Sequence, residues 1–121
     1  MKMDYPLSGE TEAAAASLLN ASPQPKKIGA KTVNVIERAD GAITAFSENG
    51  KVYSVRIRSP FSGDVRGVGI GYTKDEVIRV LGKPDRLWPV HDGIDRWFYD
   101  AKAFMRVDFN PDSDLVEFIY V

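Results

Sequence analysis

The segment GIGYTKDEVIRVLGKP, residues 69–84, constrains the fold of this chain more than any other part of the sequence. Thr73 and Glu76 have the spacing of a capping box, in which each side chain accepts a hydrogen bond from the other residue's backbone N–H. Apolar side chains then recur at helical spacing, at Val77, Ile78, Val80 and Leu81. Gly82 suits a left-handed helix end, and Pro84 blocks continuation. The segment therefore predicts a short, capped helix.

Segments with the composition of β-strands lie on both sides of this helix. Those after it are DRWFYD (95–100), KAFMRVDF (102–109) and LVEFIYV (115–121). Those before it are KTVNVIER (31–38), GAITAFSENG (41–50) and KVYSVRIRS (51–59), preceded by the alanine-rich helix candidate TEAAAASLLN (11–20). A shift of 62 residues places Thr11 on Thr73 and Asn20 on Gly82. The order helix, strand, strand, strand thus occurs twice, either as a diverged repeat or by chance.

From this order we expect an α+β fold with an antiparallel sheet and two short helices on one face. Residues 1–121 would form a single domain from two diverged repeats, at about 8–59 and 70–121.

Composition excludes several classes of function. The net charge is −1, which gives no overall basic footprint for nucleic acid. The chain has no cysteine and one histidine, so we expect no disulfide, no metal site and no cofactor. No apolar run is long enough for a membrane span, and no signal peptide is evident. The chain as written is expected to be soluble and cytoplasmic, or periplasmic if it is a processed form.

The motifs that could indicate catalysis have simpler interpretations. GVGIG (67–71) is typical of turns that lead into a capped helix, and NPDSD (110–114) of a hairpin turn. His91 lies beside Asp92, but no nucleophile is marked nearby. We therefore expect no enzyme; the alternative would require a deep polar pocket around His91.

Alternation divides the strand residues into two faces. The apolar set, expected in the core, is Tyr53, Val55, Ile57, Trp97, Tyr99, Met105, Val107 and Phe109. The opposite set, together with a loop tryptophan, gives the candidate protein-binding residues Arg56, Arg58, Arg96, Phe98, Arg106 and Trp88. Arginine and aromatic residues are enriched in interfaces, so the expected partner is a protein with an acidic surface. The alternative is an ordinary charged sheet face with cross-strand pairs such as Arg106 with Glu117.

The second half of the chain resembles the SmpA/OmlA (BamE-type) family and the wider group of domains that are similar to the beta-lactamase inhibitor protein. The resemblance covers about residues 68–121 and rests on Gly71, Thr73, Val77, Leu81, Gly82, Pro84, Trp97, Tyr99 and Phe109. The chain has no lipoprotein cysteine, and it carries Asp112 and Asp114 where a turn glycine is common in the family. The resemblance implies a fold that grips other proteins without catalysis.

We therefore expect a non-enzymatic protein-binding domain, of the inhibitor or immunity type, that covers the surface of its partner. The alternative function is a structural accessory module in bacterial envelope assembly, as in the outer-membrane relatives.

Overall fold

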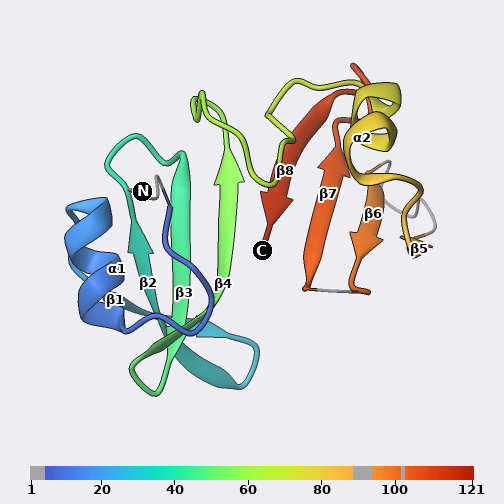
Figure 1. Ribbon diagram of the computed structural model, residues 1–121. Coiled ribbons are helices and arrows are strands. Elements are labelled where there is room, and N and C mark those ends of the chain that lie inside the picture. The colour runs from blue at the N-terminus through green and yellow to red at the C-terminus, as the bar shows by residue number, and fades with distance from the viewer. Residues whose placement is uncertain (1–4, 89–93, 102) are drawn as a thin grey trace. The chain divides into compact units, whose positions relative to one another are not determined.

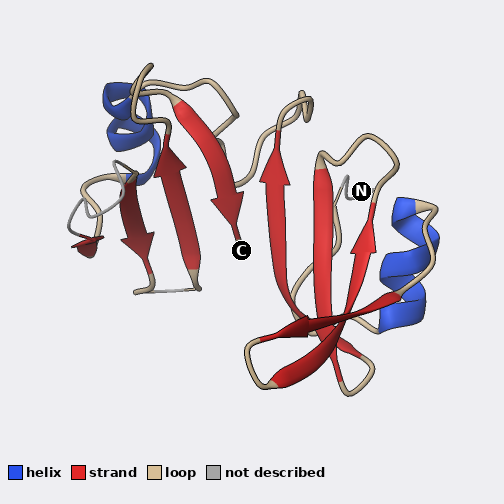
Figure 2. Cartoon of the chain, turned by 180° about the vertical axis from the view of Figure 1, so that it is seen from behind, coloured by secondary structure: helices blue, strands red, loops and turns tan. Residues whose placement is uncertain are grey.

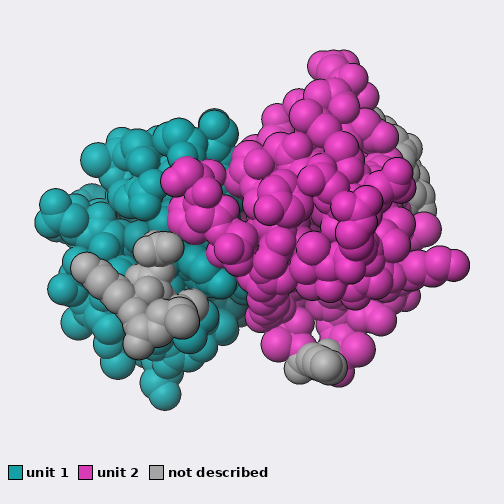
Figure 3. Space-filling model, turned by 45° about the horizontal axis from the view of Figure 1, so that its top comes forward, with its two compact units in different colours: residues 1–60, 121 teal, residues 61–120 magenta. Residues whose placement is uncertain are grey.

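The computed structural model describes residues 5–88, 94–101 and 103–121 (Figure 1). The chain forms two compact units, residues 1–60 with Val121 and residues 61–120 (Figure 3).

The first unit is one helix followed by a four-stranded meander. Its elements are α1 (Glu12–Leu19), β1 (Gln24–Ile28), β2 (Lys31–Glu37), β3 (Ile43–Glu48) and β4 (Lys51–Arg58). The strands pair antiparallel in chain order, and α1 contacts β2, β3 and β4. Apolar side chains from these elements form the core, including Ala15, Leu19, Val33, Ile36, Ile43, Ala45, Val55 and Ile57.

The second unit has the same element order (Figure 2). Its elements are α2 (Lys74–Leu81), β5 (Arg86–Trp88), β6 (Asp95–Tyr99), β7 (Met105–Phe109) and β8 (Val116–Tyr120). These strands also pair antiparallel with their chain neighbours. Buried side chains of this unit include Val65, Val68, Val77, Trp97, Met105, Val107, Phe109 and Ile119.

The expected α+β fold, with two helix-and-three-strand repeats and both helices on one face of the sheet, is wrong. Each unit has four strands and a helix of only eight residues, which lies with the strands of its own unit (Figure 1). The two strands that the sequence did not predict are β1 and β5. All residues of both strands are exposed, so neither shows the alternation that reveals a half-buried strand. The single-domain division stays a prediction.

The capped helix predicted from the sequence is present as α2. Thr73 Oγ1 accepts the N–H of Glu76 at 3.1 Å, and a Glu76 carboxylate oxygen accepts the N–H of Thr73 at 2.9 Å. Gly82 ends the helix at φ 81°, ψ −169°, a region that only glycine occupies readily. The predicted apolar stripe is narrower than expected, because Val77 is buried while Val80 is 46% exposed.

A bulge in each unit shifts the alternation of the last strand. In the β3–β4 pair, Phe46 faces Ser54 and Ser47 faces Val52, which leaves Tyr53 as the extra residue. Tyr53 is 48% exposed, so its predicted place in the core is wrong.

In the β7–β8 pair the extra residue is Glu117. It accepts a hydrogen bond from Asn110 Nδ2 at 2.9 Å instead of pairing with Arg106, so the predicted cross-strand pair is also wrong.

Candidate functional site

Two rows of paired residues cross the four strands of the second unit. In the first row, Arg86, Phe98, Arg106 and Tyr120 are successive cross-strand partners. In the second row, the successive cross-strand partners are Trp88, Arg96, Asp108 and Phe118. Directly paired residues point to the same side of a sheet, so these eight side chains share one face. We call these eight residues the arginine–aromatic face.

Asp108 anchors the two central arginines of this face. Arg106 donates from Nε and Nη2 to the two carboxylate oxygens, each at 2.9 Å, and Arg96 Nε lies 3.7 Å from Oδ2. Asp108 is only 3% exposed. A bidentate arginine–carboxylate pair fixes the guanidinium plane. The arginines are therefore held rigidly before any partner arrives.

Aromatic rings flank the guanidinium groups. Arg86 Cζ lies 4.5 Å from the centroid of the Phe98 ring, and Arg106 Cζ lies 4.0 Å from that of Tyr120. Both distances are within the range of cation–π contacts. Arg86 also donates to a carboxylate oxygen of Asp100, from Nε at 3.0 Å and from Nη2 at 2.7 Å. The first row thus alternates cation and ring across all four strands.

The exposed part of this surface is apolar as well as charged. Trp88 is 46% exposed, and its ring centroid lies 6.1 Å from that of Phe98. Phe104, just before β7, is 45% exposed and lies 6.3 Å from the same ring. Large apolar side chains with this exposure are common at sites that bind other proteins.

The structure brings four of the six predicted site residues together, namely Trp88, Arg96, Phe98 and Arg106. Trp88 belongs to a strand rather than to the predicted loop. Arg56 and Arg58 lie on β4 of the first unit, so the joint patch of all six residues stays a prediction. His91 and Asp92 lie outside the described residues.

Sequence reasoning missed Arg86, Phe118 and Tyr120. Arg86 lies in a strand of three residues, too short to show alternation. Phe118 and Tyr120 are two residues apart in VEFIYV, which places them on one face, but the bulge at Glu117 hides which face that is. The signal present in the sequence was their aromatic spacing alone.

A second ionic cluster lies at the start of α2. Lys74 Nζ donates to Asp95 Oδ2 at 2.6 Å and lies 2.8 Å from Asp114 Oδ1. Burial works to lower the pKa of Lys74, but the hydrogen bonds with Asp114 and Asp95 outweigh it and raise the pKa above its ordinary value. Lys74 therefore stays charged at neutral pH and ties the helix to β6, which is a structural role.

Within residues 5–88, 94–101 and 103–121, no group of three or more His, Asp or Glu side chains is arranged to hold a metal ion. Neither of the two described helices has the length and hydrophobicity needed to cross a membrane. Comparisons with protein-family models, with curated proteins and with solved structures found no match to this chain.

Proposed function

We propose that this chain is a non-enzymatic protein-binding domain that recognises an acidic protein surface through the arginine–aromatic face. The observation that carries the proposal is the row Arg86, Phe98, Arg106 and Tyr120, in which cations stack on rings beside the exposed Trp88. Tryptophan, tyrosine and arginine are the residues most enriched among those that dominate binding energy.

The rigidity of the face supports this function. Asp108 holds Arg96 and Arg106 in place, so little side-chain entropy remains to be lost when a partner binds. The guanidinium groups of the face attract an acidic surface and accelerate encounter, while the rings exclude water from the contact. Inhibition of a partner by covering its surface is the narrower role that we propose for such a preformed face.

Trp88 and Arg86 give the sharpest test because both are exposed. The partner would first be isolated by affinity capture, and association and dissociation rates would then be measured over a series of salt concentrations. We expect Trp88→Ala to raise the dissociation rate by about tenfold or more, as removal of an interface hot spot does. Arg86→Glu should slow association and weaken its dependence on salt.

Lys27→Glu serves as a matched charge reversal on an exposed strand of the first unit and should leave both rates unchanged. Arg56→Glu tests whether the contact extends to the first unit. Arg106→Glu is a poor probe because it would place a second carboxylate beside the buried Asp108, whereas Asp100, the partner of Arg86, is exposed to solvent. If Trp88→Ala and Arg86→Glu keep the unfolding midpoint and both rates of the wild type, the proposed surface is wrong.

A further inference from the structure

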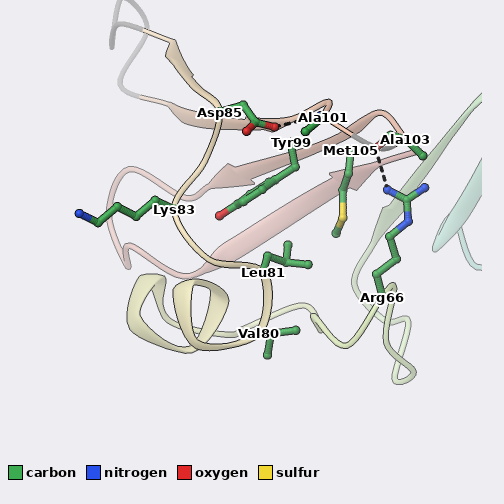
Figure 4. Close-up of a pocket in the computed structure, with 9 residues that line it drawn as sticks. All are labelled: Arg66, Val80, Leu81, Lys83, Asp85, Tyr99, Ala101, Ala103 and Met105. Carbon is green, nitrogen blue, oxygen red and sulfur yellow. Dashed lines mark hydrogen bonds between the residues drawn. The ribbon is translucent and has the colours of Figure 1, made fainter.

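The second unit also contains a pocket, with a volume of about 440 Å³, between the end of α2 and the ends of β6 and β7 (Figure 4). Figure 4 shows Leu81, Tyr99 and Met105 converging at its centre, with Val80 beside them. Met105 is buried, whereas Val80 is 46% exposed and forms an open apolar wall. The volume lies within the roughly 300–1,000 Å³ range of small-molecule sites.

Arg66 provides a fixed cation at one end of this pocket (Figure 4). Its Nη1 donates to the backbone carbonyls of Ala103 and Phe104, both at 3.2 Å. Neutral carbonyls orient the guanidinium without balancing its charge, and no carboxylate of the described residues forms an ion pair with Arg66. The residue also has a positive φ of 53°, which is uncommon outside glycine and frequent at functional positions.

At the opposite end of the pocket, the polar groups of Asp85 and Tyr99 already have hydrogen-bond partners. The Asp85 carboxylate accepts the backbone N–H groups of Asp100 and Ala101 at 2.8 and 3.0 Å. The Tyr99 hydroxyl donates to the carbonyl of Gly82 at 2.9 Å, and burial followed by the nearby Asp85 charge raises the pKa of Tyr99 to about 12. Tyr99 is therefore a neutral phenol at physiological pH. Lys83 also lines the pocket, but its side chain points away from the centre, so Arg66 is the cation that a bound ligand would meet (Figure 4).

We propose that this pocket binds a small amphipathic carboxylate, with its apolar body against Val80, Leu81 and Met105 and its carboxylate on Arg66. The Arg66 guanidinium still has free N–H donors, and a charged acceptor gives the stronger class of hydrogen bond. The site goes beyond the proposed protein binding. Tyr99 and Met105 alternate with Phe98 and Arg106 along their strands, so the pocket lies on the opposite side from the arginine–aromatic face.

Octanoate and 1-octanol form a matched pair of probes, because they share the chain length and differ in charge. Each would be titrated into the ¹⁵N-labelled full chain while ¹H–¹⁵N spectra are recorded. We expect octanoate to shift the amide signals of Leu81, Ala101 and Ala103 and to bind about tenfold or more tightly than octanol. Binding of octanol at equal or higher affinity would overturn the proposal, as would shifts that map elsewhere.

Two variants test the assignment of each part of the ligand. Arg66→Gln keeps an amide donor for the carbonyls of Ala103 and Phe104 but removes the charge, so it should weaken octanoate about tenfold and leave octanol unchanged. Val80→Asp, at an exposed helix position, should weaken both probes. Arg79→Gln removes the same charge from α2 outside the pocket and should bind octanoate like the wild type. Unchanged octanoate affinity in Arg66→Gln would refute the role of the cation.

Discussion

The two units hold their helices in equivalent ways but with opposite charges. In the first unit the helix begins with Glu12, whose carboxylate accepts two hydrogen bonds from Asn34 Nδ2, at 3.0 and 3.1 Å. It also accepts one from Ser47 Oγ at 2.8 Å. Asn34 and Ser47 face each other across the β2–β3 pair. An anion with neutral partners therefore joins α1 to two strands.

The second unit has Lys74 at the same helix position, with Asp95 and Phe109 facing each other across β6–β7. Lys74 Nζ donates to Asp95 and lies 5.3 Å from the centroid of the Phe109 ring. A cation–π contact thus replaces the Ser47 hydrogen bond, and an ion pair replaces the amide. The same backbone arrangement accepts either charge, provided that the strand residues complement it.

The outer faces differ just as clearly. In the first unit, Glu37, Thr44 and Arg56 are successive cross-strand partners. Thr44 Oγ1 donates to Glu37 at 2.9 Å, and Arg56 Nη2 lies 3.4 Å from Thr44 Oγ1 and 3.6 Å from Glu37. These three polar side chains bind one another, although Arg56 Nε is buried without a hydrogen-bond partner.

At the corresponding ladder positions the second unit has Phe98, Arg106 and Tyr120. Here rings and a guanidinium replace the polar trio. This difference favours the second unit for the proposed binding, because the two faces have the same strand pairing and differ in their side chains.

The largest expected effect concerns the core residues that face each helix. Trp97 in β6 and Ile36 in β2 occupy equivalent ladder positions and are both buried. Trp97→Ala should cost about 3–5 kcal/mol of unfolding free energy and more than Ile36→Ala, because the indole leaves the larger cavity. Urea unfolding measures both. A smaller loss at Trp97 than at Ile36 would contradict the role of the Trp97–Phe109 contact, whose centroids lie 4.7 Å apart.

The next effect concerns Asp108, the buried acid of the arginine–aromatic face. Asp108→Ala should cost about 3 kcal/mol, because it leaves Arg96 and Arg106 without the carboxylate that they share. Asp108→Asn retains an acceptor and should cost less. Thermal unfolding at constant ionic strength checks the order of the two variants. Equal stability of Asp108→Ala and the wild type would show that solvent replaces the carboxylate fully and that the face is not preorganised.

Local patterns in the sequence were sufficient for the elements that bury one face. The spacing of Thr73, Glu76 and Gly82 predicted both ends of α2, and alternation placed Met105, Val107 and Phe109 in the core. These signals are local, since capping and alternation depend on residues only a few positions apart.

The rest depended on contacts that no local pattern contains. Both exposed strands were missed, because neither shows alternation of buried and exposed side chains. The bulges at Tyr53 and Glu117 changed the side of the sheet on which these residues were expected. A bulge depends on how a strand pairs with its neighbour, which a local pattern does not contain. Of the candidate site, the sequence predicted the residues on β6 and β7 but missed those contributed by β5 and β8, apart from Trp88.

Glu12 and Lys74, which join each helix to its strands, carry opposite charges. The two units should therefore respond differently to pH. The pKa of Lys74 is higher in the folded chain than its ordinary value, so the lysine stabilises the fold below about pH 10, the ordinary lysine range. This contribution disappears as the pH rises through the folded-state pKa. Lys74→Met should cost about 1–2 kcal/mol at pH 8 and progressively less towards pH 12. Urea midpoints at several pH values measure this convergence, and a constant difference would exclude the lysine as its source.

Glu12→Gln is the matched variant in the first unit. It leaves Lys74 and its partners unchanged, so its difference from the wild type should stay constant between pH 8 and pH 12. If the stabilities of Glu12→Gln and the wild type converge over this range, the loss of stability at high pH does not come from Lys74.

The smallest expected difference lies at the helix N-caps, Thr11 and Thr73. Thr11 accepts one hydrogen bond, from the N–H of Ala14, whereas Thr73 forms the reciprocal box with Glu76. Thr73→Ala should cost about 1 kcal/mol, and Thr11→Ala somewhat less, because only the former also disturbs a reciprocal partner.

The hydrogen bonds from Thr73 hold the pKa of Glu76 below its ordinary value, so the difference between the two variants should shrink as the pH falls and Glu76 becomes protonated. Urea unfolding at pH 7 and pH 3 tests both statements. If Thr11→Ala proves the more costly at pH 7, the single cap of α1 contributes more than the box of α2, and the ranking of the two helix ends is reversed.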